Sequence, residues 1–227
     1  MLVFVAAEAR EFGGLLRHTE QVTRLDWALD FARRARLNGK PILLVANGPG
    51  PNLAGRAADV AKEHEELVGL VSTGFCGALD PALQPGDIFV ASEVLIPHRN
   101  SIAAQPAGSA RTGKLLSVDR VVSTVEEKAK LRGAGADAVE MEAAAVADRA
   151  LKWNIPFYAI RVVTDTASES FPLDFDRMRD AHGRFSRAKI LRAAFRHPAV
   201  FPELVRLNRT CKRAAQALGD FIANTRF

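Results

Sequence analysis

The chain has 227 residues, of which 48% are hydrophobic and 25% charged, so its composition excludes a disordered chain and predicts one globular domain over residues 1–227. Its two cysteines fit neither a disulfide framework nor a zinc site, so we expect no metal and a reducing, cytoplasmic location. The formal net charge of +5 gathers between Arg184 and Arg213, so the body is not a general polyanion binder and we expect no nucleic-acid partner.

Short apolar runs rich in valine and isoleucine are typical of strands. Several lack the alternation of a half-exposed strand, which predicts a sheet covered by helices on both faces. The predicted strands are Leu2–Ala7, Pro41–Asn47, Leu67–Phe75, Asp87–Leu95, Leu115–Asp119 and Phe157–Thr164. The predicted helices between them are Asn52–Leu67, Thr124–Arg132 and Met141–Trp153. This alternation of strands and helices indicates an α/β fold.

Two stretches are less regular. Trp27–Leu37 is compatible with a helix, but the Asn38-Gly39 pair after it precedes the apolar run Ile42–Val45. Because Asn-Gly is a strong signal for a type I′ turn, we favour a hairpin there. Ser101–Lys114 is rich in glycine, serine, alanine and proline, and it is predicted to be a loop.

Residues 184–227 form a basic C-terminal segment with two helical patterns. The second pattern places Leu204, Cys211 and Leu218 on one face, opposite arginines such as Arg206 and Arg209. Basic amphipathic helices can lie on anionic membranes, so peripheral contact with the inner face of a membrane is one expectation. Packing of this helix on the domain is the other.

Glycine-rich turns follow two predicted strands. Gly74–Gly77 ends one strand, where glycines let a ligand approach the backbone, although a simple tight turn is the alternative. Gly48–Gly50 precedes a helix, so its amides could hold an anion. It lacks the third glycine of a dinucleotide fingerprint, which argues against NAD. A nucleophilic pair of Cys76 and His98 is conceivable, but nothing in the local sequence supports it.

Three acids follow predicted strands. Glu142 lies with Glu140 and Met141 where a strand enters a helix, and an acid at that position could simply cap the helix. Asp165 ends the strand Phe157–Thr164 and could also be an N-cap, and Glu11 has the same ambiguity. Their shared position after strands favours one functional site.

Six motifs occur in an order that resembles the nucleoside phosphorylase and nucleosidase superfamily. They are Ala6-Ala7 with Glu11, Gly48–Gly50, Ser72–Leu79, Pro85–Ile88, Val139–Glu142 and Arg161–Asp165. The superfamily includes purine nucleoside phosphorylase, uridine phosphorylase and methylthioadenosine nucleosidase. The resemblance implies a three-layer α/β/α fold, with a central mixed twisted sheet flanked by helices, and a homo-oligomer.

Within that superfamily, Leu79–Asp87 and Arg196–Leu204 make the chain look closest to the hopanoid-associated phosphorylases, which remove adenine from an adenosylated triterpenoid lipid. The implied reaction is phosphorolysis of the N-glycosidic bond of a 5′-modified adenosine, such as adenosylhopane. Asp165 matches the acid for purine N7, Glu142 the acid that grips the ribose hydroxyls, and Glu11 the residue that activates water. The further expected substrate contacts are Met141, Glu140, Gly74, Phe75, Cys76, Val121 and Thr164.

The chain also differs from the family pattern. Ser72 and Phe75 stand where purine phosphorylases hold phosphate with an arginine and a serine or threonine, and Val121 replaces the purine-stacking aromatic of the nucleosidases. Gly48, Gly50 and Arg56 are the candidates for a phosphate or nucleophile site. Inorganic phosphate is therefore a candidate co-substrate, and no other cofactor is expected. The alternatives are a hydrolytic methylthioadenosine/adenosylhomocysteine-type nucleosidase and a non-catalytic nucleoside-binding member.

Overall fold

The computed structural model describes residues 1–170, 180 and 201–227. Its strands are β1 (Leu2–Ala6), β2 (Thr19–Arg24), β3 (Phe31–Leu37), β4 (Lys40–Ala46), β5 (Gly69–Ala78), β6 (Ile88–Leu95), β7 (Ile102–Ala103), β8 (Arg111–Ser117), β9 (Ala138–Glu140) and β10 (Phe157–Asp165). Its helices are α1 (Pro51–His64), α2 (Val125–Gly133), α3 (Ala143–Trp153) and α5 (Phe201–Ala223), with short 3₁₀ helices η1 (Ala9–Phe12) and η2 (Leu15–His18).

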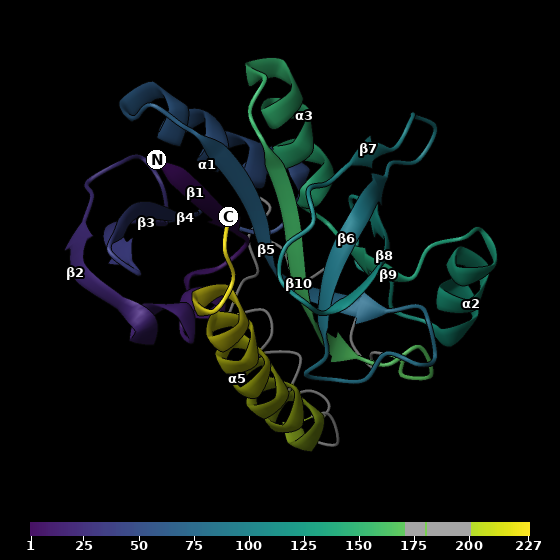
Figure 1. Cartoon of the computed structure of the whole chain (residues 1–227). Coiled ribbons are helices and arrows are strands. Elements are labelled where there is room, and N and C mark those ends of the chain that lie inside the picture. Colours follow the sequence, from purple (N-terminus) through teal and green to yellow (C-terminus); the bar gives the residue numbers. More distant parts are fainter. Residues whose placement is uncertain (171–179, 181–200) are drawn as a thin grey trace.

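The long strand β5 organises a mixed sheet (Figure 1). It pairs in parallel with β1 and β10. From β10 the pairing continues through β6, β8 and β9, and β9 pairs back with β5, so these five strands close a ring. On the other side of β1, the strands β4, β3 and β2 extend the sheet outward. The predicted α/β fold with a mixed, twisted central sheet is confirmed.

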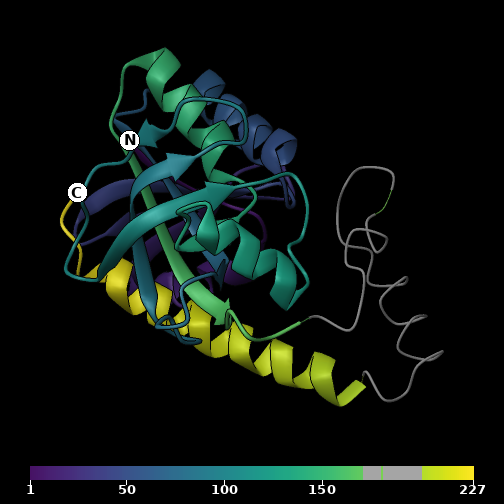
Figure 2. The same cartoon turned by 90° about the vertical axis from the view of Figure 1, so that its right-hand side faces the viewer.

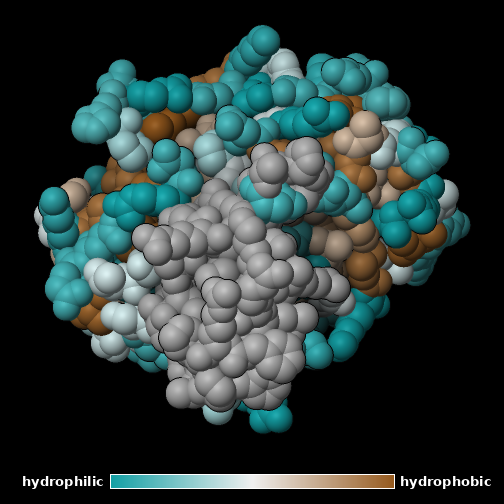
Figure 3. Space-filling model, turned by 180° about the vertical axis from the view of Figure 1, so that it is seen from behind, coloured by the Kyte–Doolittle hydropathy of each residue, from teal (hydrophilic) through white to brown (hydrophobic). Residues whose placement is uncertain are grey.

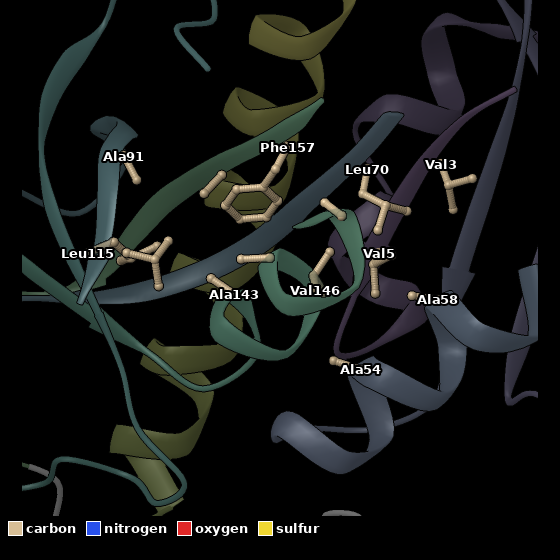
Figure 4. Packing of buried hydrophobic residues seen from close by; sticks show 14 of the residues in the cluster. Val3, Val5, Ala54, Ala58, Leu70, Ala91, Leu115, Ala143, Val146 and Phe157 are labelled. Atoms are coloured by element: carbon tan, nitrogen blue, oxygen red, sulfur yellow. The ribbon is translucent and has the colours of Figure 1, made fainter. Parts of the chain in front are cut away.

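Helices cover both faces of this sheet, with α1 and α3 on one side and α5 on the other (Figure 2). Alternate residues of β1 serve the two faces, as the period of two along a strand requires. Val3 and Val5 join a cluster with Ala58 of α1 and Val146 of α3 (Figure 4). Phe4 belongs to a second cluster, which contains Leu218 and Ile222 of α5.

The hairpin prediction is confirmed, and the loop prediction is wrong in part. Asn38 and Gly39 have φ of 50° and 77°, and β3 and β4 pair in antiparallel on either side of them. Ser101–Lys114, predicted to be a loop, contains β7 and the first half of β8. Both strands form by pairing with β6, and such long-range pairing overrides the local turn composition. The strand β2 was not predicted, and β9 was anticipated only as a strand that enters the helix at Glu140–Glu142.

Helix α5 packs on the domain through its apolar face. Cys211, Ala214, Leu218 and Ile222 are buried, and α5 contacts β10, η1 and η2. The predicted second helical pattern is therefore confirmed as a helix that packs on the domain, while the first pattern lies outside the described residues. No described helix is long and apolar enough to span a membrane. Seen from behind, much of the described surface is hydrophilic, with hydrophobic residues visible in between (Figure 3).

Two glycines let α5 approach the N-terminal segment. A Cβ on Gly219 of α5 would overlap backbone atoms of Gly14 and Leu15. Backbone atoms cannot move aside as a flexible side chain can, so we predict that Gly219→Ala lowers the free energy of unfolding by about 1–3 kcal/mol. Urea denaturation measures this loss. Gly133→Ala in α2 is the matched control, because a Cβ there meets nothing within 4 Å; equal stability of the two variants would contradict the close approach.

Candidate active site

One cavity in the described part of the chain gathers the buried acids. It has a volume of about 200 Å³ and lies where β5 and β10 end, next to the residues that follow β1. Carboxyl ends of parallel strands meet at one edge of a sheet, which is where α/β proteins bind ligands. A second cavity, of about 840 Å³, lies beside α1 and α3. Its arginines Arg99 and Arg149 pair with Asp148 and Asp59, so it offers no comparable cluster of buried acids.

Glu11 is held at the cavity by two backbone amides. Its Oε2 accepts the N–H of Glu8 at 2.8 Å, and its Oε1 accepts the N–H of Phe75 at 2.9 Å. Gly74 makes this possible, since its φ is +138° and a Cβ there would lie 2.5 Å from Glu11 Oε1. Burial raises the pKa of Glu11, although the two amides oppose the rise.

Arg161 and Glu140 form a buried ion pair behind the cavity. Arg161 lies on β10 and is fully buried; its Nη2 donates to Ser72 Oγ at 2.7 Å and to Glu140 Oε2. The Glu140 carboxylate also accepts the N–H groups of Glu142 and Ala143 at 2.8–3.0 Å, so it caps α3. Glu140 lines the cavity as predicted, but these bonds favour a positioning role over direct substrate contact.

Glu142 stands at the N-terminus of α3 with its side chain buried in the cavity wall. Its Oε1 accepts the N–H of Gly50 at 2.8 Å. Burial, together with repulsion from Glu140, raises the pKa of Glu142 to about 8, although Arg161 opposes the rise. The side chain is therefore largely protonated at neutral pH, and a neutral carboxyl group can both donate and accept hydrogen bonds.

Asp165 lines the same cavity at the end of β10 and pairs with Lys128. The two groups form an ion pair with 2.6 Å between Lys128 Nζ and Asp165 Oδ2, while Thr164 Oγ1 lies 3.0 Å from Oδ1. Burial raises the pKa of Asp165, and Lys128 opposes the rise. Sequence reasoning missed Lys128, because a lysine inside the polar helix pattern Thr124–Arg132 carries no signal of burial.

Most of the predicted site residues line this one cavity. They are Glu11, Phe75, Cys76, Val121, Glu140, Met141, Glu142, Thr164 and Asp165. The backbone of Gly74 lies close to the Glu11 carboxylate, and the Gly50 N–H donates to Glu142 Oε1. The Gly48 N–H donates to Ala7 O at 2.8 Å. Their functional roles remain predictions.

Two other candidates do not reach the cavity. Arg56 is exposed on α1 and absent from the lining residues, so the structure does not bring it to the cavity, and its role at a phosphate or nucleophile site stays a prediction. The helix turns this side chain to solvent while its neighbours Gly55 and Ala57 face the core. His98 is also exposed and outside the lining, and burial raises the pKa of the Cys76 thiol, so a nucleophilic Cys76–His98 pair is not supported.

Cations at the cavity are paired with acids throughout the described residues. At the mouth, Arg10 pairs with Glu8 and lies 5.8 Å from the centre of the Phe75 ring, and Arg120 pairs with Glu127. In the interior, Arg161 and Lys128 have the partners given above. In the described part of the chain, each of these four cations therefore has an acidic partner.

Comparisons with known proteins identify the family. The model of the "Phosphorylase superfamily" matches residues 2–108 and 99–196. A 5′-methylthioadenosine/S-adenosylhomocysteine nucleosidase of Staphylococcus aureus is 28% identical, over 47% of this chain and 60% of the relative. The chain thus spans about 60% of the length of the curated relatives it matches.

Solved structures agree in fold. The 5′-methylthioadenosine/S-adenosylhomocysteine nucleosidase of Neisseria meningitidis, in complex with methylthio-immucillin-A, has a TM-score of 0.74 at 22% identity and covers 98% of this chain and 96% of its own. The S-adenosylhomocysteine nucleosidase of Streptococcus pyogenes, in complex with 5-methylthiotubericidin, has a TM-score of 0.73 at 19% identity with the same coverage. At these identities the likeness establishes the fold.

The raised pKa of Glu142 predicts how stability depends on pH. The unfolded carboxyl group ionises near its ordinary pKa of 4.5, while the folded one keeps its proton up to about pH 8. This contribution to stability is present below pH 4.5 and is lost as the pH rises through 8. Glu142→Gln cannot ionise, so between about pH 5 and 8 it should gain on the order of 3 kcal/mol relative to wild type.

Denaturant unfolding at a series of pH values measures this gain. Glu126→Gln, on the exposed side of α2, is the control and should leave the pH dependence unchanged. A constant difference between Glu142→Gln and wild type across the range would show that Glu142 is ionised in the folded protein.

Proposed function

The chain belongs to the phosphorylase superfamily, and we propose that it hydrolyses the N-glycosidic bond of an adenine nucleoside with a modified 5′ position. The observation that carries this proposal is the meeting of Glu11, Glu142 and Asp165 in one cavity at the ends of β5 and β10. Cleavage of an N-ribosyl bond builds positive charge on the sugar and negative charge on the base. The cavity offers carboxyl groups for both ends of that bond.

Asp165 is the proposed acid for the departing adenine. Transfer of a proton to N7 neutralises the negative charge that develops on the base, and such general acid help contributes about 10²–10⁴-fold to the rate. An acid must hold its proton near neutral pH, and burial, which raises the pKa of Asp165, favours this. Val121 and Met141 supply apolar lining to the same cavity.

Glu142, Glu11 and Arg161 form the proposed sugar and water end. Glu142 is suited to grip the ribose hydroxyls, because its neutral carboxyl can donate and accept hydrogen bonds. Glu11 is the proposed base for the attacking water, since a carboxylate whose pKa is raised by burial binds a proton more strongly. Arg161 Nε is buried and has no hydrogen-bond partner within the described residues, which leaves an N–H that a water at this end could accept from.

Water is favoured over phosphate by the charges of the site. The cavity's cations already pair with carboxylates, and Arg56, the arginine expected to help bind phosphate, is exposed away from it. The similarity to proteins named 5′-methylthioadenosine/S-adenosylhomocysteine nucleosidase points the same way. Phosphorolysis of an adenosylated lipid such as adenosylhopane is the alternative, and it requires inorganic phosphate as co-substrate; no other cofactor is part of the proposal.

The remaining expectations concern partners and location. We expect a homo-oligomer, as the superfamily resemblance implies, and a reducing compartment such as the cytoplasm, because Cys76 and Cys211 are buried free thiols. Membrane contact through α5 is disfavoured, because its apolar face packs on the sheet. A small-molecule nucleoside is the proposed ligand, and we expect no nucleic-acid partner.

Chromatography of free adenine tests the proposal. We predict release from methylthioadenosine or adenosylhomocysteine at a rate that does not depend on phosphate. Asp165→Asn should lower kcat by about 10²–10⁴-fold, since the amide keeps the shape and loses the proton. Asp26→Asn, an exposed change of the same type, is the control and should keep full activity.

Three other results would favour one of the alternatives. Release that requires phosphate would identify a phosphorylase, and release from adenosylhopane alone would identify the lipid as substrate. Adenine binding without release from any nucleoside, in a folded protein, would favour a non-catalytic nucleoside-binding member.

A further inference from the structure

Lys128 is a buried, charged residue to which the proposed mechanism assigns no role. Lysine is almost never fully buried without a partner, yet the Lys128 side chain has 0% exposure. Its Nζ donates to Asp165 Oδ2 at 2.6 Å, to Thr166 O at 2.7 Å and to Glu169 O at 3.0 Å. An ammonium group has three donors, so these three bonds fix the Nζ in place.

The bonds of Lys128 distinguish the two oxygens of Asp165. Because the ammonium group donates to Oδ2, a proton on a neutral Asp165 belongs on Oδ1. Thr164 Oγ1 lies 3.0 Å from that Oδ1 and 3.2 Å from Cys76 O. The Thr164 hydroxyl can therefore donate to Oδ1 when Asp165 is charged and turn to Cys76 O when Oδ1 carries a proton.

On the basis of the proposed function, we propose that Lys128 is a positioning residue that fixes Asp165 with its proton on Oδ1 and strengthens it as the acid for the departing base. In the step itself, the Oδ1–H bond breaks and the proton forms an N–H bond at N7. The electron pair of the glycosidic C–N bond stays with the base. Asp165 becomes a carboxylate beside the Lys128 ammonium, which keeps its three protons, and regains a proton from solvent after release.

Other titratable groups face Asp165 from three directions. Glu169 lies on the segment after β10, where its carboxylate accepts the N–H of Thr166 at 2.8 Å and pairs with Arg206 of α5 at 2.8 Å. Cys76 of β5 and Cys211 of α5 also interact with Asp165. Burial raises the pKa of both thiols, that of Cys211 to about 11, so they are neutral at physiological pH. Lys128 is thus the cation paired directly with the acid.

Removal of the Lys128 charge has two opposite effects on such an acid. Without the ammonium group the carboxylate is less stable, so Asp165 gives up its proton less readily and kcat should fall on the acidic side of the profile. For the same reason Asp165 keeps its proton to higher pH. A neighbouring opposite charge lowers the pKa of a carboxyl group by about 1–3 units. In the variants without this charge, the alkaline limb of the pH–kcat profile should therefore move to higher pH by about that amount. A merely structural role would lower kcat and leave the limb in place.

The experiment measures kcat for adenine release against pH in four proteins. Lys128→Met removes the charge, Lys128→Gln removes the charge but keeps one donor for Thr166 O, Lys128→Arg keeps the charge, and the exposed Lys130→Met on the same helix is the control. The alkaline limb should move to higher pH in Lys128→Met and Lys128→Gln. It should stay near that of wild type in Lys128→Arg and Lys130→Met. An unmoved limb in a folded Met or Gln variant would overturn the proposal.

A second measurement separates this proposal from the proposed function. Carboxyl ¹³C NMR follows the titration of Asp165 directly, with Asp165→Asn to assign the signal. If wild type releases no adenine, the proposed function fails, and the titration still shows whether Lys128 lowers the pKa of Asp165. Equal titration of Asp165 in wild type and in both neutral variants would overturn the role of Lys128. If both neutral variants fail to fold, the wild-type titration decides, since an Asp165 that resists ionisation well above neutral pH despite the ammonium group would overturn it too.

Discussion

The buried guanidinium of Arg161 is the interaction on which the site depends. A buried charge is tolerated only when it is paired and hydrogen-bonded, and Arg161 meets this condition through Ser72 and Glu140. Glu11 and Glu142 also lie within its electrostatic influence. One cation cannot neutralise three carboxylates, so at least one of the acids must keep a proton. Burial, together with this excess of carboxyl groups, raises the pKa of Glu142, and a neutral acid suits a ribose hydroxyl.

Lys128 gives the Asp165 side of the cavity a different electrostatic character. There one carboxyl group faces one ammonium group, whereas three carboxyl groups share Arg161 elsewhere in the site. The two ends of the cavity therefore differ in proton affinity although both are built from buried carboxyl groups. Different environments for similar acids are the usual way in which one site supplies both acid and base chemistry at neutral pH. This division matches the opposite charges that develop on the base and the sugar of a nucleoside.

Sequence reasoning predicted the parts of the fold that local pattern determines. The strand–helix alternation, the Asn38-Gly39 turn and the amphipathic helix α5 all have local signals. The strand β9 has three residues and exists because it pairs with β5 and β8, and β7 likewise depends on β6. No local pattern reports such pairing.

Sequence reasoning predicted the acids of the site and missed its cations. Glu11, Glu142 and Asp165 follow predicted strands, and the sheet brings strand ends together. Arg161 was noticed only as part of a motif, because an arginine inside an apolar strand gives no indication of its partners. Arg56 looked suitable for phosphate in the sequence, but the rotation of α1 turns it to solvent. Burial and pairing of charges are tertiary properties, which is why a single sequence does not reveal them.

We propose that the carboxyl groups of this cavity direct water, and not phosphate, to the sugar. Mass spectrometry of the sugar product formed with phosphate present distinguishes the two nucleophiles. We expect a free sugar and no sugar 1-phosphate. A sugar 1-phosphate as the product would show that phosphate is the nucleophile.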